Sequence, residues 1–300
     1  MGLECVVNVS EGRDGSVLDR LAATAGPSLL DRHSDPDHHR TVFTLAGTDD
    51  EVEAAVRRLT AEAVATLDLG IHDGQHPRIG VVDVVPFVPL RVHPSLEGGQ
   101  GSVEVARVDP SPPLDAAVAA RDRFAHWAWN EIELPCFLYG PLPGGGERTL
   151  PEVRKLAFRG LDPDVGAARP HPTAGAGAVG ARGFLVAYNL WLAGADLQVA
   201  REMARLLRGP GVRALGLELS SGVQVSCNLV DPVAHGPAEV HDRLGALLEG
   251  SGAVIRGCEL VGLVPAAVLD ATPTTRWEEV GLDPEATIER RLAASGVSWR

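Results

Sequence analysis

One order of secondary structure, βαββαβ, is predicted twice along this 300-residue chain, and it limits the possible folds more than any other feature. In the first half, apolar periodicities and turn residues predict strands and helices in this order at 4–9, 16–25, 28–31, 41–46, 48–68 and 80–86. In the second half they predict the same order at 184–190, 196–207, 212–219, 223–229, 237–248 and 253–259. A unit of this kind forms one sheet with its helices on one face. We therefore predict an α/β protein (an α+β sandwich) of two ferredoxin-like, split-βαβ subdomains, with helices outside the sheets and a cleft between the subdomains.

The segment between the two repeated units adds further elements. Helices are predicted at 113–130 and 149–158, and a strand at 135–139. Residues 161–182 are rich in Pro, Gly and Ala, so we expect little regular structure there. Because long irregular segments in compact proteins usually serve binding or linkage, we interpret this segment as a binding loop or a linker.

The charge balance excludes several classes of partner. With 40 acidic against 27 basic side chains, the chain has a formal net charge of −13, whereas nucleic-acid binding needs a cationic surface. No run of about 18 uncharged apolar residues is present, so we expect no membrane span. The amino terminus shows no basic segment followed by an apolar run, and the four widely spaced cysteines are interpreted as reduced core thiols. These features favour a cytoplasmic protein that acts on a small molecule, including an anionic one held by local Arg or His side chains.

A glycine-rich segment, Gly175-Ala176-Gly177-Ala178-Val179-Gly180, matches the G-x-G-x-x-G pattern of dinucleotide-binding folds. That pattern functions only where a strand precedes it and a helix follows, because the helix amino terminus holds the pyrophosphate. Here a Pro-rich loop precedes it and a run typical of a strand follows, so we expect no nucleotide. We interpret the segment as a crossing at which the backbone approaches a ligand or another strand.

Histidines are concentrated around the segment Ile71-His72-Asp73-Gly74-Gln75-His76-Pro77-Arg78. His72 and His76 have the i,i+4 spacing of a helical metal pair, but Gly74 and Pro77 argue against a helix, so we expect no metal. A turn that leads into the following strand is favoured instead. In such a turn an imidazole, whose unperturbed pKa is about 6.5, is either a solvated loop side chain or a group that exchanges protons with a ligand. The residues alone leave both alternatives open.

Two asparagines lie near strand ends in the second repeated unit. The carboxamides of Asn189 and Asn228 are candidates for fixing a polar substrate, although turn or cap roles fit the same residues equally well. The sequence contains no nucleophile elbow, no Walker loop and no zinc signature.

Short motifs spread along the chain occur in the order of one known family. They are Glu4-Cys5-Val6 with Asn8, Ser10-Glu11-Gly12-Arg13, Arg40-Thr41-Val42, His76-Pro77-Arg78 with Asp83-Val84 and Pro86-Phe87, Leu138-Tyr139-Gly140, Thr149-Leu150-Pro151, Gly180-Ala181-Arg182 with Phe184-Leu185, Gln224-Val225-Ser226 with Asn228-Leu229, and Glu259-Leu260-Val261-Gly262-Leu263-Val264-Pro265. By these blocks, from about residue 3 to residue 272, the chain resembles the glutamate formiminotransferases (glutamate formimidoyltransferases). These also form the formiminotransferase portion of the bifunctional formiminotransferase-cyclodeaminases.

The resemblance implies a fold and an activity. The fold is an N-terminal subdomain over 1–180 and a C-terminal subdomain over 181–300, which enclose a substrate passage. The activity is transfer of a formimino group from N-formimino-L-glutamate to N5 of tetrahydrofolate, which gives 5-formiminotetrahydrofolate and L-glutamate in histidine breakdown. Tetrahydrofolate is then a co-substrate, neither a metal nor a nucleotide is required, and the protein is expected to be a homodimer.

The resemblance also implies site residues. His76, which precedes Pro-Arg, is expected to be the catalytic general base and acid. The folate-binding stretch is expected from Gly166 to Gly175, and Gly166, Pro172 and Gly175 match it. Arg40 and Arg78 are candidates for pairing with a substrate carboxylate, because a guanidinium binds carboxylates bidentately.

Departures from the family pattern keep other functions open. Pro170 and Ala174 stand at positions that are usually aromatic in the folate-binding stretch. One alternative is a diverged enzyme on the same scaffold that uses another one-carbon donor or acceptor. The other is a non-catalytic protein that binds a small molecule.

Overall fold

The computed structural model describes residues 2–74, 77–97 and 103–295 of the chain. Contacts divide the chain into two compact units. Unit 1 comprises the described residues of Met1–Val92, Pro112–Gly183 and Ser295–Arg300, and unit 2 comprises those of His93–Ser111 and Phe184–Ala294. The subdomain limits 1–180 and 181–300, and the cleft between the subdomains, stay a prediction.

Unit 1 is built on a seven-stranded sheet with the strand order β2-β3-β1-β4-β9-β7-β8. Its first elements are β1 (Gly2–Val9), α1 (Gly15–Ala25), β2 (Leu29–Asp35), β3 (Arg40–Thr48), α2 (Asp49–Thr66) and β4 (Val82–Leu90). Strand β1 pairs antiparallel with β3 and with β4, and β2 pairs antiparallel with β3. The predicted βαββαβ order and its split-βαβ sheet are therefore confirmed in this unit.

The second half of unit 1 extends this sheet beyond β4. Its elements are α3 (Asp115–Ile132), β7 (Cys136–Pro141), β8 (Glu147–Arg148), α4 (Leu150–Leu156) and β9 (Gly177–Ala181). Strand β9 lies parallel between β4 and β7, so the expectation of little regular structure up to residue 182 is wrong at its end. The Gly and Ala residues of β9 have low strand propensity, which concealed the strand in the sequence. At Gly180 a Cβ atom would lie 2.0 Å from Cζ of Tyr139, so glycine is what allows these strands to pair.

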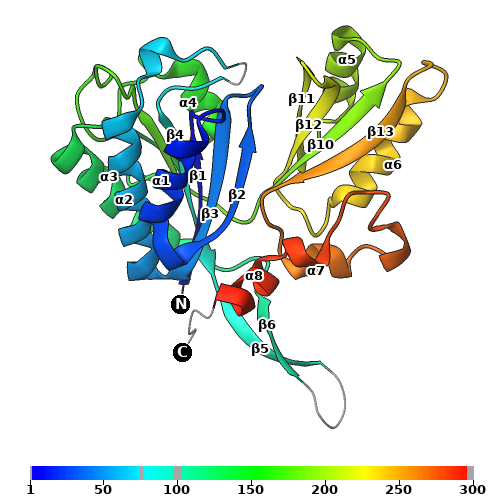
Figure 1. Ribbon diagram of the computed structural model, residues 1–300, viewed down its shortest axis with the longest axis horizontal. Coiled ribbons are helices and arrows are strands. Elements are labelled where there is room, and N and C mark those ends of the chain that lie inside the picture. Colours follow the sequence, from blue (N-terminus) through cyan, green and yellow to red (C-terminus); the bar gives the residue numbers. More distant parts are fainter. Residues whose placement is uncertain (1, 75–76, 98–102, 296–300) are drawn as a thin grey trace. The chain divides into compact units, whose positions relative to one another are not determined.

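Helices pack outside this sheet, as predicted. Figure 1 shows α1, α2 and α3 along one face, where they bury the main core of the unit. Helix α2 begins at the capping box of Thr48 and Glu51 and buries Val52, Val56 and Leu59 on one apolar stripe. Val153 of α4 packs in a smaller core on the opposite face.

Unit 2 repeats the plan of the first half of unit 1. Its elements are β10 (Val186–Ala193), α5 (Leu197–Leu207), β11 (Val212–Leu219), β12 (Gly222–Leu229), α6 (Pro237–Leu248) and β13 (Val254–Val261). Their antiparallel sheet has the order β11-β12-β10-β13, and α5 and α6 pack on one of its faces. The second predicted βαββαβ unit is therefore also confirmed.

Further short elements, which the sequence did not predict, complete the chain. They are the hairpin β5 (Val92–Glu97) and β6 (Val103–Val108), helices α7 (Ala266–Asp270) and α8 (Ile288–Ser295), and the 3-10 helices η1 (Gly26–Ser28), η2 (Leu69–Ile71), η3 (Thr274–Arg276) and η4 (Pro284–Ala286). The Glu289 carboxylate of α8 accepts hydrogen bonds from the backbone N–H groups of Val108 (3.1 Å) and Ala266 (2.8 Å). This buried carboxylate therefore ties β6 and α7 together.

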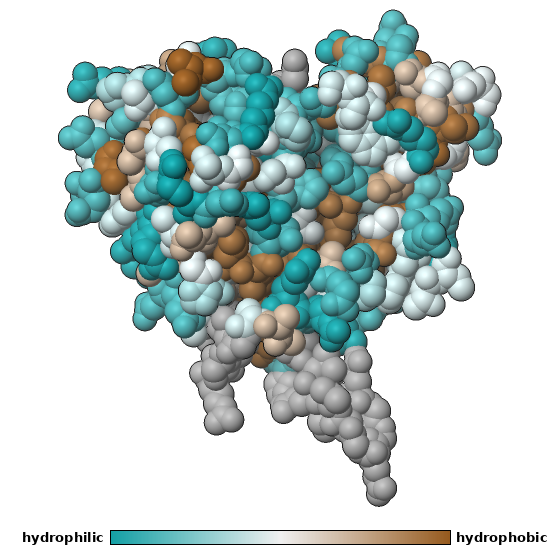
Figure 2. All heavy atoms as spheres, viewed as in Figure 1, coloured by the Kyte–Doolittle hydropathy of each residue, from teal (hydrophilic) through white to brown (hydrophobic). Residues whose placement is uncertain are grey.

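The surface and the thiols fit the composition. On the face shown in Figure 2, hydrophilic and intermediate side chains cover most of the surface. None of the described helices is long and apolar enough to cross a lipid bilayer.

Cys5, Cys136 and Cys227 are buried and Cys258 is half-buried. Burial raises the pKa of the Cys227 thiol to about 12, so this thiol stays protonated at neutral pH.

Candidate functional site

The predicted catalytic residue belongs to the loop in unit 1 that joins η2 to β4. His76 and its neighbour Gln75 lie outside the described residues, so the role of His76 stays a prediction. The loop is described on both sides of this gap, at residues 72–74 and 77–81. The contacts of these flanking residues show how the loop is held.

Upstream of the gap, the loop is held by two stacked imidazoles. The rings of His39 and His72 lie 4.2 Å apart between centroids, with 29° between their planes. Nε2 of His72 lies 2.9 Å from the backbone oxygen of His39, which can only accept a hydrogen bond, so this nitrogen carries a proton. Nδ1 of His72 accepts the N–H of Gly74 at 3.2 Å and faces the Arg78 guanidinium, which also donates to the Gly74 carbonyl. His72 is therefore held as the neutral Nε2–H tautomer.

The protonation of both imidazoles follows from their surroundings. Burial lowers the pKa of His72; the hydrogen bond to the His39 carbonyl opposes this shift, and the positive charge of Arg78 adds to it, so the pKa lies below its ordinary value. Burial also lowers the pKa of His39, whose Nδ1 accepts the N–H of Gly12 at 3.1 Å. Both rings are therefore neutral at pH 7 and carry no positive charge.

Gly74 is required for this packing. A Cβ atom at position 74 would lie 2.5 Å from the His38 carbonyl oxygen and 2.6 Å from Cβ of His39. No side chain fits at these distances, so the loop approaches the β2–β3 turn this closely only with glycine.

Downstream of the gap, a buried ion pair anchors the loop. Asp83 is almost fully buried and accepts the backbone N–H of Ile79 at 2.8 Å. Its other carboxylate oxygen lies 2.6 Å from Nη2 of Arg154, a residue of α4. Arg154 also donates to the carbonyl of Pro77. Residues 77–79 are therefore fixed to the sheet and to α4.

The loop after β1 packs against residues 80–81, directly before β4. Ser10 donates from its backbone N–H to the carbonyl of Val81 (2.7 Å) and from its hydroxyl to the carbonyl of Gly80 (2.9 Å). The Glu11 carboxylate accepts the backbone N–H groups of Arg13 (2.6 Å) and Asp14 (2.9 Å). These bonds fold the Ser10-Glu11-Gly12-Arg13 motif against the start of β4.

On the exposed side of this contact, an ion pair joins the loop after β1 to the loop that carries His76. Nη1 of Arg13 lies 2.6 Å from the carboxylate of Asp73. The same Asp73 oxygen lies 4.0 Å from Nε2 of His39. The loop after β1 therefore contacts the loop of His76 through side chains as well.

Arg40 and Arg78, the two predicted carboxylate partners, are both in this region of unit 1. Arg40 begins β3, directly after the turn that carries His39. Burial lowers the pKa of Arg40, and Arg154 lowers it further against the opposing charge of Asp83, so that it is about 10. Arg40 therefore stays cationic at neutral pH in an environment that is largely shielded from solvent.

The predicted folate-binding stretch adjoins the same loop. Residues His171 and Gly175 bond to each other through both backbone pairs, at 2.7 and 3.1 Å, and close a tight turn that includes Pro172. The carbonyls of Thr173 and Ala174 accept the N–H groups of Leu69 (2.8 Å) and Val81 (2.9 Å).

One further bond continues this contact, since Ala176 N–H donates to the carbonyl of Ile79 at 3.0 Å. The carboxyl end of the Gly166–Gly175 stretch is therefore part of the same backbone network as the loop of His76. Gly166, at the other end of the stretch, lies against Pro135 and Trp129.

The two predicted asparagines lie in unit 2. Asn189 on β10 is buried and donates to the Glu259 carboxylate at 3.1 Å. Asn228 on β12 is exposed and pairs in register with Ala187 and Arg213. Both are interior residues of their strands and project on the sheet face opposite α5 and α6, so neither caps a helix nor forms a turn.

Sequence reasoning overlooked several residues that shape the site. His39, Asp73 and Arg154 had no assigned role, because nothing in their local pattern marks them. Glu11 and Asp83 belong to motifs of the family resemblance, and both carboxylates accept backbone N–H groups that shape these loops. Among the described residues, no group of three or more His, Cys, Asp and Glu side chains is arranged to hold a metal ion.

Comparisons with known proteins agree with the resemblance in the sequence. The model of a family described as the formiminotransferase domain, N-terminal subdomain, matches residues 2–182. A glutamate formimidoyltransferase of Streptococcus pyogenes serotype M1 is 35% identical over 288 residues, which cover 89% of this chain and 90% of that protein. A glutamate formimidoyltransferase of Thermoplasma acidophilum is 27% identical and covers 97% of both chains. The formimidoyltransferase-cyclodeaminase of Sus scrofa is 31% identical over 90% of this chain, which spans 51% of that protein.

Proposed function

Because the chain belongs to the formiminotransferase family, a family of one-carbon transferases, we propose that it moves a formimino group from N-formimino-L-glutamate to N5 of tetrahydrofolate. The products are 5-formiminotetrahydrofolate and L-glutamate. In this proposal His76 is the general base and acid, and the stretch from Gly166 to Gly175 binds the folate. The family resemblance also leads us to propose that the protein acts in histidine breakdown. On the same basis we propose that it is cytoplasmic and forms a homodimer.

One observation supports this proposal above the others. The backbone of residues 173–176 is hydrogen-bonded to Leu69, Ile79 and Val81, on both sides of the loop that carries His76. A folate bound along the Gly166–Gly175 stretch would therefore lie beside that loop. The segment proposed for the co-substrate and the segment proposed for proton transfer, which are about 90 residues apart in the sequence, are thus joined by backbone hydrogen bonds in unit 1.

The reaction needs one proton to move between two nitrogens. N5 of tetrahydrofolate attacks the amidine carbon of the donor, and a tetrahedral intermediate forms. N5 then loses its proton to a base, the glutamate nitrogen receives a proton as the bond from carbon to that nitrogen breaks, and the formimino group stays on N5. One imidazole can take the first proton and return it, which typically contributes a factor of about 10²–10⁴ in rate.

Precise positioning explains why the loop is anchored on both sides. Holding two substrates and a base in a reactive geometry can contribute more than acid–base catalysis itself. His39 and His72 fix residues 72–74, and Asp83 and Arg154 fix residues 77–79. Arg40 and Arg78, which stay charged at neutral pH, are proposed to pair with carboxylates of the donor or of the folate tail.

The departures in the folate-binding stretch fit this proposal better than the sequence suggests. Ala174 is fully buried in the main core of unit 1, so an aromatic side chain at this position would not offer an exposed stacking surface. Pro170 is exposed and is therefore the position at which a stacking contact has been lost. We accordingly expect folate binding that is weaker than in relatives with an aromatic residue there, rather than absent.

The test is turnover with N-formimino-L-glutamate and tetrahydrofolate, followed through the formation of 5-formiminotetrahydrofolate. We expect activity in the wild type and a loss of at least about 100-fold in His76→Ala. His93→Ala, which removes an exposed histidine from unit 2, is the matched control and should retain activity.

Two other results would replace the proposal by its alternatives. Tetrahydrofolate binding without turnover would indicate a non-catalytic binding protein. Binding of neither substrate would indicate an enzyme with another donor or acceptor. Full activity of His76→Ala would remove the assignment of the base.

A further inference from the structure

The sheet of unit 2 has one face without helices, and a row of polar side chains crosses its middle. The strand register pairs Asn189 of β10 directly with Ser226 of β12 and with Glu259 of β13. Because residues in register project on the same face, these side chains and those two residues along each strand form one surface. Gln224 of β12 belongs to it, diagonally opposite Asn189.

Gln224 has the most unusual environment of this row. It has no solvent-exposed surface, yet neither its carboxamide oxygen nor its nitrogen has a hydrogen-bond partner among the described residues. A buried carboxamide without partners destabilises the fold, so its presence requires an explanation.

The neighbours of Gln224 do not supply those hydrogen bonds. In register it lies between Trp191 of β10 and Leu217 of β11, whose side chains offer it no acceptor. The guanidinium of Arg256 lies 5.3 Å from the centroid of the Trp191 ring and donates to the carbonyl of Ser221 at 2.6 Å. The carboxamide therefore sits beside a flat aromatic surface, with its donor and acceptor positions unused.

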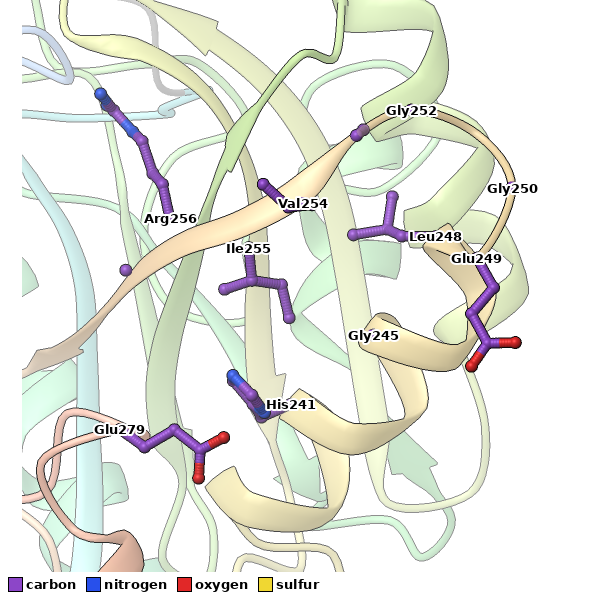
Figure 3. A pocket seen from close by; sticks show the side chains of 12 residues that line it. His241, Gly245, Leu248, Glu249, Gly250, Gly252, Val254, Ile255, Arg256 and Glu279 are labelled. Atoms are coloured by element: carbon purple, nitrogen blue, oxygen red, sulfur yellow. The ribbon is translucent and has the colours of Figure 1, made fainter.

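The direction of the Arg256 side chain distinguishes the sheet face that carries the polar row from the face covered by α6 (Figure 3). Figure 3 shows a groove between α6 and β13, into which Ile255 and His241 point. The Arg256 side chain leaves β13 in another direction, away from α6. The polar row is thus distinct from that groove.

We propose that Gln224, together with Glu259 and Asn189, binds the planar N–H edge of an amidine-type group in a small-molecule ligand. The identity of the ligand rests on the proposed function, which offers two sources of this chemistry. One is the formimino group of the donor, and the other is the 2-aminopyrimidine edge of the reduced pterin. Both present an N–C–N unit that carries N–H donors.

The types of side chain in the row favour such an edge over a carboxylate. Glu259 accepts N–H donors and repels a carboxylate, and the carboxamide of Gln224 offers one acceptor and one set of donors. Gln224 and Glu259 are separated by two strand spacings across the sheet and by two residues along the strands, which together give about 11–12 Å between their Cα atoms. A planar ligand that lies across β10 therefore contacts both of them and can stack near Trp191.

The experiment replaces Gln224 by leucine, which has a similar size and no hydrogen-bonding atoms. Gln198→Leu, at an exposed position on α5, is the matched control. Dissociation constants are measured calorimetrically for three probes: tetrahydrofolate, N-formimino-L-glutamate and unsubstituted pterin. The melting temperature of each protein is recorded as well.

We expect Gln224→Leu to weaken the binding of one class of probe about tenfold and to leave the melting temperature unchanged or higher. Weaker binding of both tetrahydrofolate and pterin assigns the row to the pterin edge. Weaker binding of formiminoglutamate alone assigns it to the formimino group. Gln198→Leu should match the wild type with every probe.

Other outcomes overturn the proposal. These are affinities of Gln224→Leu within about twofold of the wild type, failure of the wild type to bind any probe, or loss of folding in both Gln224→Leu and Gln224→Met. The last result would show that the carboxamide supports the fold. Normal turnover with unchanged affinities removes this site and leaves the proposed function intact, whereas pterin binding that depends on Gln224 without turnover does the reverse.

Discussion

His72 donates the proton of its Nε2 atom to the backbone carbonyl of His39 at 2.9 Å, and the two rings stack at 4.2 Å. This contact joins the β2–β3 turn to the loop before β4, although the two residues are 33 positions apart. It also fixes the tautomer of His72, since a carbonyl can only accept. The pair therefore acts as a clamp on the loop that carries His76, rather than as a second proton carrier.

Replacing His72 by alanine should slow turnover without removing it. The substitution deletes the stack, the bond to the His39 carbonyl and the acceptor for Gly74 N–H. Because a displacement of about 1 Å at a reacting group can cost about 100-fold, we expect kcat to fall by roughly 10- to 100-fold. Steady-state kinetics measure this, and the fall should be smaller than that of His76→Ala.

His72→Gln is the informative companion, since its amide nitrogen can still donate to the His39 carbonyl. It should recover part of the lost kcat. Equal activity of His72→Ala and the wild type would show that the clamp does not position the loop.

Much of the fold could be predicted from the sequence because each βαββαβ unit has strong local signals. Helix α2 has a capping box and an apolar stripe, and both are read from neighbouring residues. Strand β9 lacks such a signal, since its Gly and Ala residues are explained only by the Tyr139 ring that packs on Gly180. The hairpin of β5 and β6 is likewise held by Glu289, a residue distant in the sequence.

The candidate site was predictable only where a motif marks it. The His76-Pro77-Arg78 motif and the Gly166–Gly175 stretch were identified from the family resemblance, and the latter adjoins the loop through backbone bonds that no sequence pattern reveals. Arg154 illustrates the limit most clearly. It reaches the loop from α4, 71 residues beyond its partner Asp83, and helical periodicity places it no differently from any surface arginine.

Gly74→Ala should damage both the loop and the activity. An added methyl group would overlap the His38 carbonyl oxygen and Cβ of His39, so the loop must move away from the β2–β3 turn. We expect kcat to fall at least tenfold and the melting temperature to fall by a few degrees. Gly144→Ala is a matched control, because a Cβ atom there meets nothing within 4 Å. Normal turnover of Gly74→Ala would show that this approach is unimportant for catalysis.

Arg154→Ala should destabilise unit 1 by removing the partner of a buried charge. Only 2% of the Asp83 side chain is exposed, and the substitution leaves its carboxylate without the Arg154 guanidinium. Breaking such a pair typically costs about 3–5 kcal/mol in the free energy of unfolding, and the partial exposure of Arg154 places our expectation near the lower end. Denaturant unfolding measures the change.

The control for this prediction is Arg205→Ala, which breaks an exposed i,i+3 pair with Glu202 on α5. It should leave the unfolding midpoint unchanged, because exposed pairs contribute little. If both variants were as stable as the wild type, the ion pair would have no anchoring role. If Arg154→Ala were stable but inactive, its role would be confined to the loop.

The neutral imidazoles of His39 and His72 should make the fold sensitive to mild acid. Burial is the main cause that lowers the pKa of each ring below its unfolded value of about 6.5. As the pH falls through 6.5, the unfolded chain therefore binds protons that the folded chain does not, and the free energy of unfolding decreases. Asp35 contributes little in this pH range, because its pKa, although raised by burial, is brought to about 2 by hydrogen bonds from His38 and Asp37.

A double variant, His39→Gln with His72→Gln, removes both titrating rings and keeps polar side chains at both positions. We expect the free energy of unfolding of the wild type to fall more between pH 7.5 and pH 5.5 than that of the double variant, with the difference confined to this range. Denaturant unfolding at several pH values measures it, and His93→Gln, at an exposed position, should behave as the wild type does. Parallel curves for the wild type and the double variant would mean that the two rings titrate in the folded protein as they do in the unfolded chain. The clamp would then hold protonated and neutral imidazoles equally well, which contradicts a His72 ring fixed between a carbonyl acceptor and a guanidinium donor.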